Sequence, residues 1–234
     1  VLFAGQHHFS VRGYLYAVGT ESDSIVFQGL NTDQPGYWNG VDIGYNYNTP
    51  GPDATLSYFR IDGGGNQYYN PQAGLGIGDR KGNISISHGL LTNNGYTGVR
   101  VYSMDGTSTD SAFVTFSDIK INDAGYHGFR VTDNYYTVLD IKDVLVKDGY
   151  DDGFYVAYNY YSDIDLNSVD VKNCFDSGIE LYQNYSYTTV EVELSNFKNN
   201  VTRNANSTTG RDHTTPTEIH IRGSYDYTNG GYTF

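Results

Sequence analysis

The sequence holds one cysteine, one methionine, one tryptophan and five prolines in 234 residues. The single cysteine, Cys174, excludes a disulfide framework within the chain. No run of about 18 apolar residues occurs, so the sequence predicts no transmembrane segment. No signal peptide is visible in the sequence. Because the chain begins with Val1 instead of methionine, we expect a mature or trimmed chain whose leader has been removed.

Basic residues are also scarce. The chain has 14 Lys and Arg residues against 27 Asp and Glu residues, a formal net charge of −13. This charge repels a phosphate backbone and an anionic lipid surface, so nucleic acid and membrane are not expected partners. Nucleotide-binding glycine loops, paired CxxC motifs and HExxH motifs are absent from the sequence.

Tyrosine and glycine dominate what is present, with 24 Tyr, 11 Phe and 28 Gly residues. Tyrosine favours strands and half-buried surfaces, because its ring packs while its hydroxyl stays hydrated. Frequent glycines allow frequent turns. The composition therefore predicts an all-β domain.

An internal repeat runs through the second half of the chain. Four similar segments align on a glycine that precedes an apolar position, at Gly98, Gly128, Gly153 and Gly178. The first step between these glycines is 30 residues and the next two are 25 residues. Such a period is too regular for an ordinary globular chain and is typical of a solenoid.

A second set of segments repeats with the same period, over residues 84–93, 114–123, 139–148, 164–173 and 190–199. Each begins with alternating apolar residues, which is typical of a strand, and ends on Asn or Asp, which tolerate a left-handed turn. The pattern predicts a single-stranded right-handed parallel β-helix (β-solenoid). We expect one such domain over residues 1–234, with about nine coils and with Ile141 and Leu166 as interior neighbours.

The N-terminal third adds a resemblance to a known family. Gly19-Thr20 is followed by Ile25-Val26-Phe27 and then by Trp38-Asn39-Gly40-Val41. Over about the first 65 residues, this order resembles secreted and cell-surface right-handed parallel β-helix proteins of the pectate-lyase-like superfamily fold. The resemblance implies the fold and an extracellular or cell-surface location, and it implies no particular activity.

One column of side chains is predicted to face outward from the β-helix. It consists of Asp42, Gly76, Arg100, Arg130, Tyr155, Glu180 and His220. In β-helix lyases and epimerases, Arg neutralises the carboxylate of an acidic sugar while Tyr or His moves a proton. If the protein is an enzyme, the candidate catalytic residues of this column are Arg100, Arg130, Tyr155, Glu180 and His220. The alternative is an exposed sheet whose charges pair weakly, by about 0–1 kcal/mol each.

A second outward column brings carboxylates together. It contains Ser85, Thr115, Asp140, Asp165 and Glu191. Three carboxylates on successive coils repel one another unless a cation intervenes, and calcium takes several oxygen ligands. Asp140, Asp165 and Glu191 are therefore a candidate calcium site, with nearby Lys142 as the alternative partner. No EF-hand or nonapeptide calcium motif accompanies them, and no other cofactor is expected.

A third candidate lies at a turn of the repeat, where His127 is expected beside Asp151, Asp152 and Asp176 on neighbouring coils. Paired carboxylates can hydrolyse glycosides by acid–base catalysis. Polygalacturonases share the predicted fold, but their ordered motifs do not occur here. The Asn-Thr-Asp of residues 31–33 lies too far from the Asp-Asp of residues 151–152, and Arg-Ile-Lys is missing.

Asparagine and aromatic residues form further columns. Asn134, Asn159 and Asn184 are predicted to form a ladder of side-chain hydrogen bonds, and Tyr135, Tyr160 and Tyr185 are candidate binding residues. We expect Tyr96, Tyr126, Tyr150 and Phe175 to stack as one aromatic column. N-x-[ST] sequons make Asn83, Asn184, Asn200 and Asn206 candidate glycosylation sites.

The ends of the chain show no helical cap. Residues 1–11 are apolar and strand-like, and residues 223–234 end on aromatics and glycines. An open end of a β-helix exposes unpaired backbone groups, so we expect self-association through the chain ends. Residues 199–216 are polar without an apolar period, which predicts an inserted, protruding loop.

Two functions remain open from the sequence. Because no catalytic signature is complete, the favoured hypothesis is an extracellular structural or adhesion module that can self-assemble into filaments or surfaces. The alternative is a carbohydrate-active enzyme (lyase, epimerase or hydrolase) that acts on an acidic polysaccharide. A groove over the Arg100–Glu180 column would favour the enzyme, and a flat sheet with its ends in contact would favour the structural module.

Overall fold

The computed structural model describes residues 1–31, 33–44, 53–79, 82–185, 187–193, 195–198, 200, 203–208, 218–221, 224–226 and 231–233. All regular elements in this part of the chain are strands. Consequently, it contains no helix that is long and apolar enough to cross a membrane. The predicted all-β class is confirmed.

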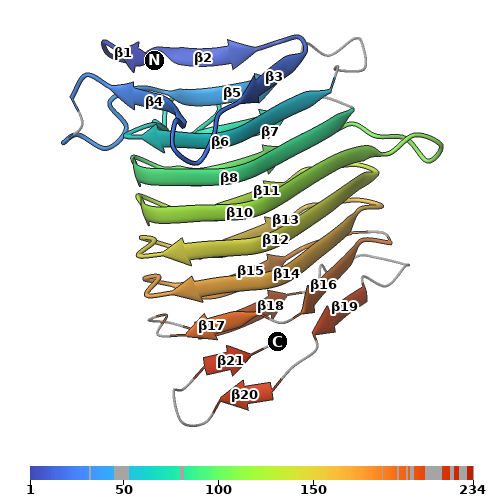
Figure 1. The fold of residues 1–234 in the computed structure, drawn as a ribbon. Coiled ribbons are helices and arrows are strands. Elements are labelled where there is room, and N and C mark those ends of the chain that lie inside the picture. The colour runs from blue at the N-terminus through green and yellow to red at the C-terminus, as the bar shows by residue number, and fades with distance from the viewer. Residues whose placement is uncertain are drawn as a thin grey trace.

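The described strands form two sheets, which are parallel except at the C-terminal end of the first (Figure 1). The first sheet is built on the long strands β6 (Ala54–Asp62), β8 (Asn83–Asn94), β10 (Ala112–Ala124), β12 (Thr137–Lys147) and β14 (Asp163–Lys172). β1 (Leu2–Phe3), β3 (Leu15–Val18) and β4 (Ile25–Gly29) precede them, and β16 (Thr189–Glu193), β17 (Asn196–Lys198), β19 (Glu218–Ile221), β20 (Ser224–Asp226) and β21 (Gly231–Thr233) follow.

The second sheet contributes one short strand to each coil. Its order is β2 (His8–Val11), β5 (Gly40–Gly44), β7 (Ala73–Gly78), β9 (Thr97–Tyr102), β11 (Phe129–Thr132), β13 (Phe154–Ala157), β15 (Ser177–Tyr182) and β18 (Arg203–Thr208). The chain alternates between the two sheets, so the fold is the predicted parallel β-solenoid. It has about seven turns, fewer than the nine coils expected.

The register between coils follows the repeat. Ile141 lies beside Leu166 on the neighbouring strand, and both side chains are fully buried, which confirms the predicted interior pair. The aligned glycines have a steric reason. A Cβ atom on Gly153 would lie 2.1 Å from Cγ1 of Val171 and 2.6 Å from the carbonyl oxygen of Gly178, so no larger side chain fits there without a shift.

The predicted turn column is present at the ends of the long strands. Asn93, Asp123, Asp148 and Asn173 all have positive φ, between 52° and 59°. Asn and Asp adopt this left-handed conformation more readily than other non-glycine residues, which explains their repetition. A second positive-φ column, at Tyr58, His88, Asp118, Asp143 and Ser168, lies within the long strands. The sequence had not indicated this column, because its residue types vary.

The asparagine ladder is confirmed. Nδ2 of Asn134 donates to Oδ1 of Asn159, and Nδ2 of Asn159 donates to Oδ1 of Asn184, each over 2.8 Å. The same two acceptors also receive the backbone N–H groups of Asn134 and Asn159. All three side chains are buried, so the ladder supplies their hydrogen bonds inside the solenoid.

The single aromatic column predicted from Tyr96, Tyr126, Tyr150 and Phe175 is wrong. Tyr96 stacks on Tyr126 with ring centroids 4.6 Å apart, and Tyr150 stacks separately on Phe175 at 5.5 Å. The backbone N–H of Asp151 donates to the carbonyl of Tyr126, so the residue in register with Tyr126 is Asp151. Tyr150 is 24 residues from Tyr126, one short of the period, and therefore belongs to the next column.

The C-terminal region also departs from expectation. Within the segment predicted as a polar loop, Arg203–Thr208 form β18, which pairs in parallel with β15. The rest of residues 199–216 lies outside the described residues, apart from Asn200. β21 pairs antiparallel with both β17 and β20, so strands instead of a helix cover the edge of β17. Backbone pairing requires no apolar period, which is why composition misassigned β18.

Candidate functional site

The outward column of the second sheet is present in the predicted register. Gly76, Arg100, Arg130, Tyr155 and Glu180 occupy paired positions on β7, β9, β11, β13 and β15. The prediction for His220 is wrong. His220 pairs with Glu191 across β16 and β19 in the first sheet, and Asn206 follows Glu180 in the column. The apolar alternation around His220 fits a strand of either sheet, so it could not assign the residue to one of them.

The two arginines of this column differ in their partners. Nη1 of Arg100 donates to the carbonyl oxygen of Pro71 at 3.2 Å and to Oε1 of Gln72 at 3.0 Å. Its guanidinium also lies 4.4 Å from the ring centroid of Tyr102. Burial lowers the pKa of Arg100, and the charge of Arg130 lowers it further. Arg100 is thus held in place, with a second cation directly beside it.

Arg130 is half-buried, yet it has neither an ion pair nor a hydrogen bond with the residues that the structure describes. Its guanidinium lies over the ring of Tyr155, 5.7 Å from the centroid, and its Nε is buried without a partner. An unpaired guanidinium is unexpected in a chain with a net charge of −13. The position therefore has unused capacity to bind an anion.

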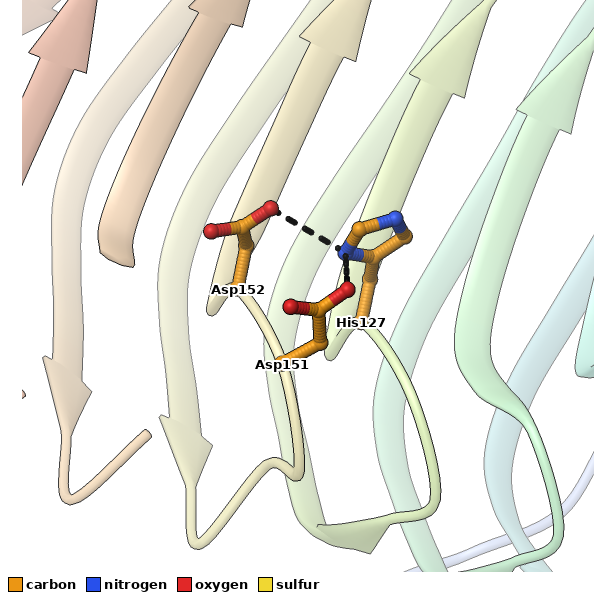
Figure 2. A group of neighbouring side chains, drawn as sticks. All are labelled: His127, Asp151 and Asp152. Atoms are coloured by element: carbon orange, nitrogen blue, oxygen red, sulfur yellow. Dashed lines mark ion pairs between the residues drawn. The ribbon is translucent and has the colours of Figure 1, made fainter. Parts of the chain in front are cut away.

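His127 and two carboxylates form a compact cluster beside this column (Figure 2). His127 lies in the turn before β11, and Asp151 and Asp152 lie in the corresponding turn before β13. Nδ1 of His127 is 3.5 Å from Oδ2 of Asp151 and 3.3 Å from Oδ2 of Asp152. The side chains of His127 and Asp152 are only 4% and 3% exposed, whereas that of Asp151 is 23% exposed.

Aromatic rings hold the imidazole in place. The ring of His127 stacks on Tyr155 with centroids 4.6 Å apart and planes 6° apart, and Tyr126 contacts it at 4.0 Å. Tyr155 therefore contacts both the imidazole and the guanidinium of Arg130. The sequence had indicated the column and the turn as separate candidates, and the fold makes them one contiguous site.

Burial dominates the electrostatics of the cluster. It lowers the pKa of His127 to about 3, and the positive charge of Arg130 acts in the same direction against the charge of Asp151. Burial raises the pKa of Asp152 to about 6, although the backbone N–H of Ser177 hydrogen-bonds its carboxylate. Burial also raises the pKa of Asp151. Without a further ligand, the imidazole is thus neutral at physiological pH.

The fourth predicted member of the turn, Asp176, lies outside the cluster. Its negative charge contributes to the raised pKa of Asp152, after burial, and its Oδ1 accepts a 3.5 Å hydrogen bond from the hydroxyl of Ser177. Among the described residues, only His127, Asp151 and Asp152 bring three possible metal-ligand atoms (a His nitrogen, a Cys sulfur or a carboxylate oxygen) within 4.8 Å of one another. Asp176 therefore adds negative potential without a direct contact.

The acidic column of the first sheet has the predicted register. Thr115, Asp140, Asp165 and Glu191 occupy successive paired positions. Burial raises the pKa of Asp165, and the charges of Asp140 and Glu191 raise it further. These side chains repel one another, but their oxygens do not gather into a compact three-ligand cluster in the described structure. Calcium binding at this column stays a prediction.

The predicted tyrosine column is stacked. Tyr135 and Tyr160 lie with ring centroids 4.6 Å apart, and Tyr160 and Tyr185 lie 4.7 Å apart. A second column that we had not predicted runs beside it, through Tyr136, Tyr161 and Tyr187. The adjacent tyrosine pairs at 135–136 and 160–161 were the signal for it. A binding role for either column stays a prediction.

The structure distinguishes among the glycosylation candidates. Asn83 is exposed. Asn184 is only 5% exposed and its Nδ2 donates to the carbonyl of Val156, so the ladder excludes a glycan there in the folded protein. Oδ1 of Asn200 accepts a hydrogen bond from the backbone N–H of Cys174. The side chain of Asn206 lies outside the described residues. A sequon motif carries no information about burial, which explains the wrong prediction for Asn184.

A groove on the first sheet was also missed. It has a volume of about 490 Å³ and is lined in part by Tyr58, His88, Asp118 and Lys120. Nδ1 of His88 lies 2.8 Å from Oδ2 of Asp118, and the ring of His88 stacks on Tyr58. These residues belong to the positive-φ column, whose position only the backbone geometry reveals. The groove lies on the other sheet from Arg130.

Comparisons with known proteins bear on the fold. No family model and no curated protein matches the chain. The enzymatically active domain of bacteriophage CBA120 tailspike protein 2 aligns with 96% of this chain at 14% identity and a TM-score of 0.50. The chain spans 39% of that domain's length. An alginate lyase from Paenibacillus sp. str. FPU-7 aligns over 94% of this chain and 90% of its own, at 14% identity and a TM-score of 0.27. At this identity the tailspike likeness shows a shared parallel β-helix fold and nothing finer, and the lyase aligns too loosely to add to it.

Proposed function

We propose that the protein binds an acidic polysaccharide along the second sheet, with Arg100 and Arg130 as the partners of the sugar's carboxylate. The observation that carries this proposal is Arg130, a half-buried guanidinium that has no anionic partner among the described residues of an acidic chain. A guanidinium binds a planar carboxylate through two parallel hydrogen bonds, which makes a uronic acid a well-matched ligand.

The pairing of the two arginines supports the same ligand. Arg100 and Arg130 are directly opposed on neighbouring strands, and like charges in this position destabilise a sheet. A bound carboxylate offsets that repulsion, and relief of the repulsion adds to the free energy of binding. Tyr102 and Tyr155 lie under the guanidinium groups of Arg100 and Arg130, and these cation–π contacts orient the two cations. An extracellular location, where such polysaccharides occur, is part of this proposal.

Turnover of the polysaccharide is the finer part of the proposal. A uronate held by Arg130 would lie close to Tyr155 and Glu180, the next two residues of the column. Elimination at the uronate creates an unsaturated product that absorbs in the near ultraviolet, and hydrolysis creates reducing ends. Screening pectin, alginate and glycosaminoglycans for both products, and for epimerised residues, separates an enzyme from a binding module.

Replacing Arg130 with alanine is expected to weaken binding of polygalacturonate or alginate by about tenfold or more, because a charge-assisted hydrogen bond in a partly buried site is lost. Isothermal titration calorimetry measures the affinity, with neutral dextran as the ligand control. Arg60→Ala is the matched protein control, because Arg60 lies on the other sheet and pairs with Asp62. Equal affinities for wild type and Arg130→Ala would refute the proposal.

A self-assembling structural module is the second candidate. At the N-terminal end of the solenoid, β1, β2 and β3 each pair with one neighbour, and Val1, Leu2, Tyr14 and Tyr16 are mostly exposed there. If this edge pairs with another copy, deleting residues 1–5 should abolish higher-order species. Size-exclusion chromatography with light scattering, applied to the full chain and to the chain without residues 1–5, tests this. A full chain that stays monomeric at high concentration contradicts self-association.

A further inference from the structure

One buried nitrogen of the His127 cluster has no hydrogen-bond partner in the described part of the chain. Nδ1 of His127 forms no hydrogen bond with any residue that the structure describes, although the side chain is 4% exposed and the nitrogen faces two carboxylates (Figure 2). Its distances to the two Oδ2 atoms, 3.5 Å and 3.3 Å, exceed the usual range of about 2.7–3.2 Å for an N–H···O bond. Buried polar atoms in folded proteins nearly always have a partner, so this nitrogen requires an explanation.

The spacing of these atoms fits three ligands of one metal ion. Zinc lies about 2.0–2.1 Å from a histidine nitrogen and at a similar distance from a carboxylate oxygen. Tetrahedral geometry then separates neighbouring ligand atoms by about 1.63 times that length, or about 3.3–3.4 Å. The two nitrogen–oxygen distances, 3.3 Å and 3.5 Å, match this value. All three ligand atoms lie within 4.8 Å of one another.

We infer that His127, Asp151 and Asp152 bind one divalent metal ion of the zinc type, through Nδ1 of the histidine and one oxygen of each carboxylate. One imidazole and two carboxylates form a mixed nitrogen and oxygen donor set, which suits zinc or manganese. Calcium prefers six to eight oxygen ligands, which this buried corner does not offer. The site is distinct from Asp140, Asp165 and Glu191, where all the ligands would be oxygens.

Neighbouring groups hold the ligands in the required orientation. The backbone N–H of Ser177 donates to Oδ1 of Asp152 at 3.0 Å, which leaves Oδ2 directed at the cluster. The imidazole plane is fixed by its stacking on Tyr155. Such supporting contacts around the ligands are typical of metal sites in proteins.

The site also has the charge and the access that an ion needs. Two carboxylates face the position of the ion, and the charge of Asp176 adds to the local negative potential. The partial exposure of Asp151 provides an entry path, and a water molecule can complete a four-ligand shell on that side. This inference does not depend on polysaccharide binding, because it rests on the turn and not on Arg100 or Arg130.

The direct test titrates zinc chloride, and separately manganese chloride, into the full chain after EDTA treatment and dialysis. We expect one ion bound per chain by calorimetry and a higher melting temperature when zinc is present, because an ion that binds only the folded state stabilises it. Polysaccharide is absent from both measurements, so failure of the proposed function would leave the result unaffected. If neither metal binds by calorimetry, and zinc, manganese and EDTA all leave the melting temperature unchanged, the inference is overturned. A proton shared between Nδ1 and the carboxylates would then be indicated.

Variants connect the bound ion to this cluster. Asp151→Asn, at the most exposed ligand, is expected to weaken zinc binding by about tenfold or more. His127→Asn removes the nitrogen ligand and is expected to weaken zinc binding by a similar factor. It replaces Asp151→Asn as the test if that variant folds poorly. His88→Asn is the matched control, because His88 pairs with Asp118 at 2.8 Å on the other sheet, outside the cluster. Zinc affinity unchanged in both cluster variants, or lost equally in the control, would overturn the inference.

Discussion

Replacing Phe154 with alanine is expected to lower the free energy of unfolding by about 3–5 kcal/mol. Phe154 is fully buried between Phe129 and Ile179 on the neighbouring coils, and its ring stacks on Phe129 with centroids 5.1 Å apart. The substitution removes this stacking and leaves a cavity that parallel strands cannot close, because their spacing is set by backbone hydrogen bonds. Denaturant-induced unfolding measures the loss.

Two controls show whether burial is the cause. Phe113 lies on β10 but is 45% exposed, so Phe113→Ala should cost well under half as much. Phe154→Leu keeps most of the apolar volume and should be milder than Phe154→Ala. A loss at Phe113 equal to that at Phe154 would contradict the described interior of the solenoid.

Asn159→Ala is expected to lower the free energy of unfolding by about 2–4 kcal/mol, because it leaves two buried groups without partners at about 1–3 kcal/mol each. The groups are the backbone N–H of Asn134, which donates to Oδ1 of Asn159, and Nδ2 of Asn134, whose 2.8 Å hydrogen bond to the same oxygen is lost. Asn159 is itself fully buried and also donates to the carbonyl of Val131. The loss would therefore extend over three coils.

The control for the ladder is an asparagine outside it. Asn122 on β10 is partly exposed, and Asn122→Ala is expected to change the free energy of unfolding by no more than about 0.5 kcal/mol. Thermal and denaturant unfolding of the two variants and the wild type give the comparison. An Asn159→Ala chain as stable as the Asn122→Ala chain would show that the ladder contributes little.

The repeat made most of the register predictable. Stacked coils of equal length place residue i beside residue i+25, so Ile141 and Leu166, or Asn134 and Asn159, could be paired from spacing alone. The same rule assigns a residue to the wrong column when its spacing differs from 25 by one residue. Tyr150 resembles Tyr126 in type, but it is 24 residues away and lies in a different column.

Assignment of a strand to a sheet was less predictable. The alternation around His220 fits both sheets, and only backbone pairing shows that β19 joins β16. β18 was missed altogether, because its polar sequence hides a strand whose hydrogen bonds come from β15. In both cases the deciding interactions are between main-chain atoms, which leave no pattern in side-chain types.

The sequence by itself determined the solenoid, its period, its interior pairs and its asparagine ladder, because these depend on residues one coil apart. The tertiary structure alone decided that His127, Asp151 and Asp152 meet the Arg130–Tyr155 column, since the path of each turn brings the rings of His127 and Tyr155 within 4.6 Å. It also decided the burial of the cluster, which makes His127 neutral, and it leaves Nδ1 of His127 without a hydrogen bond among the described residues. Spacing orders residues along the stack, whereas the contacts across a coil depend on turn geometry and burial, which spacing does not contain.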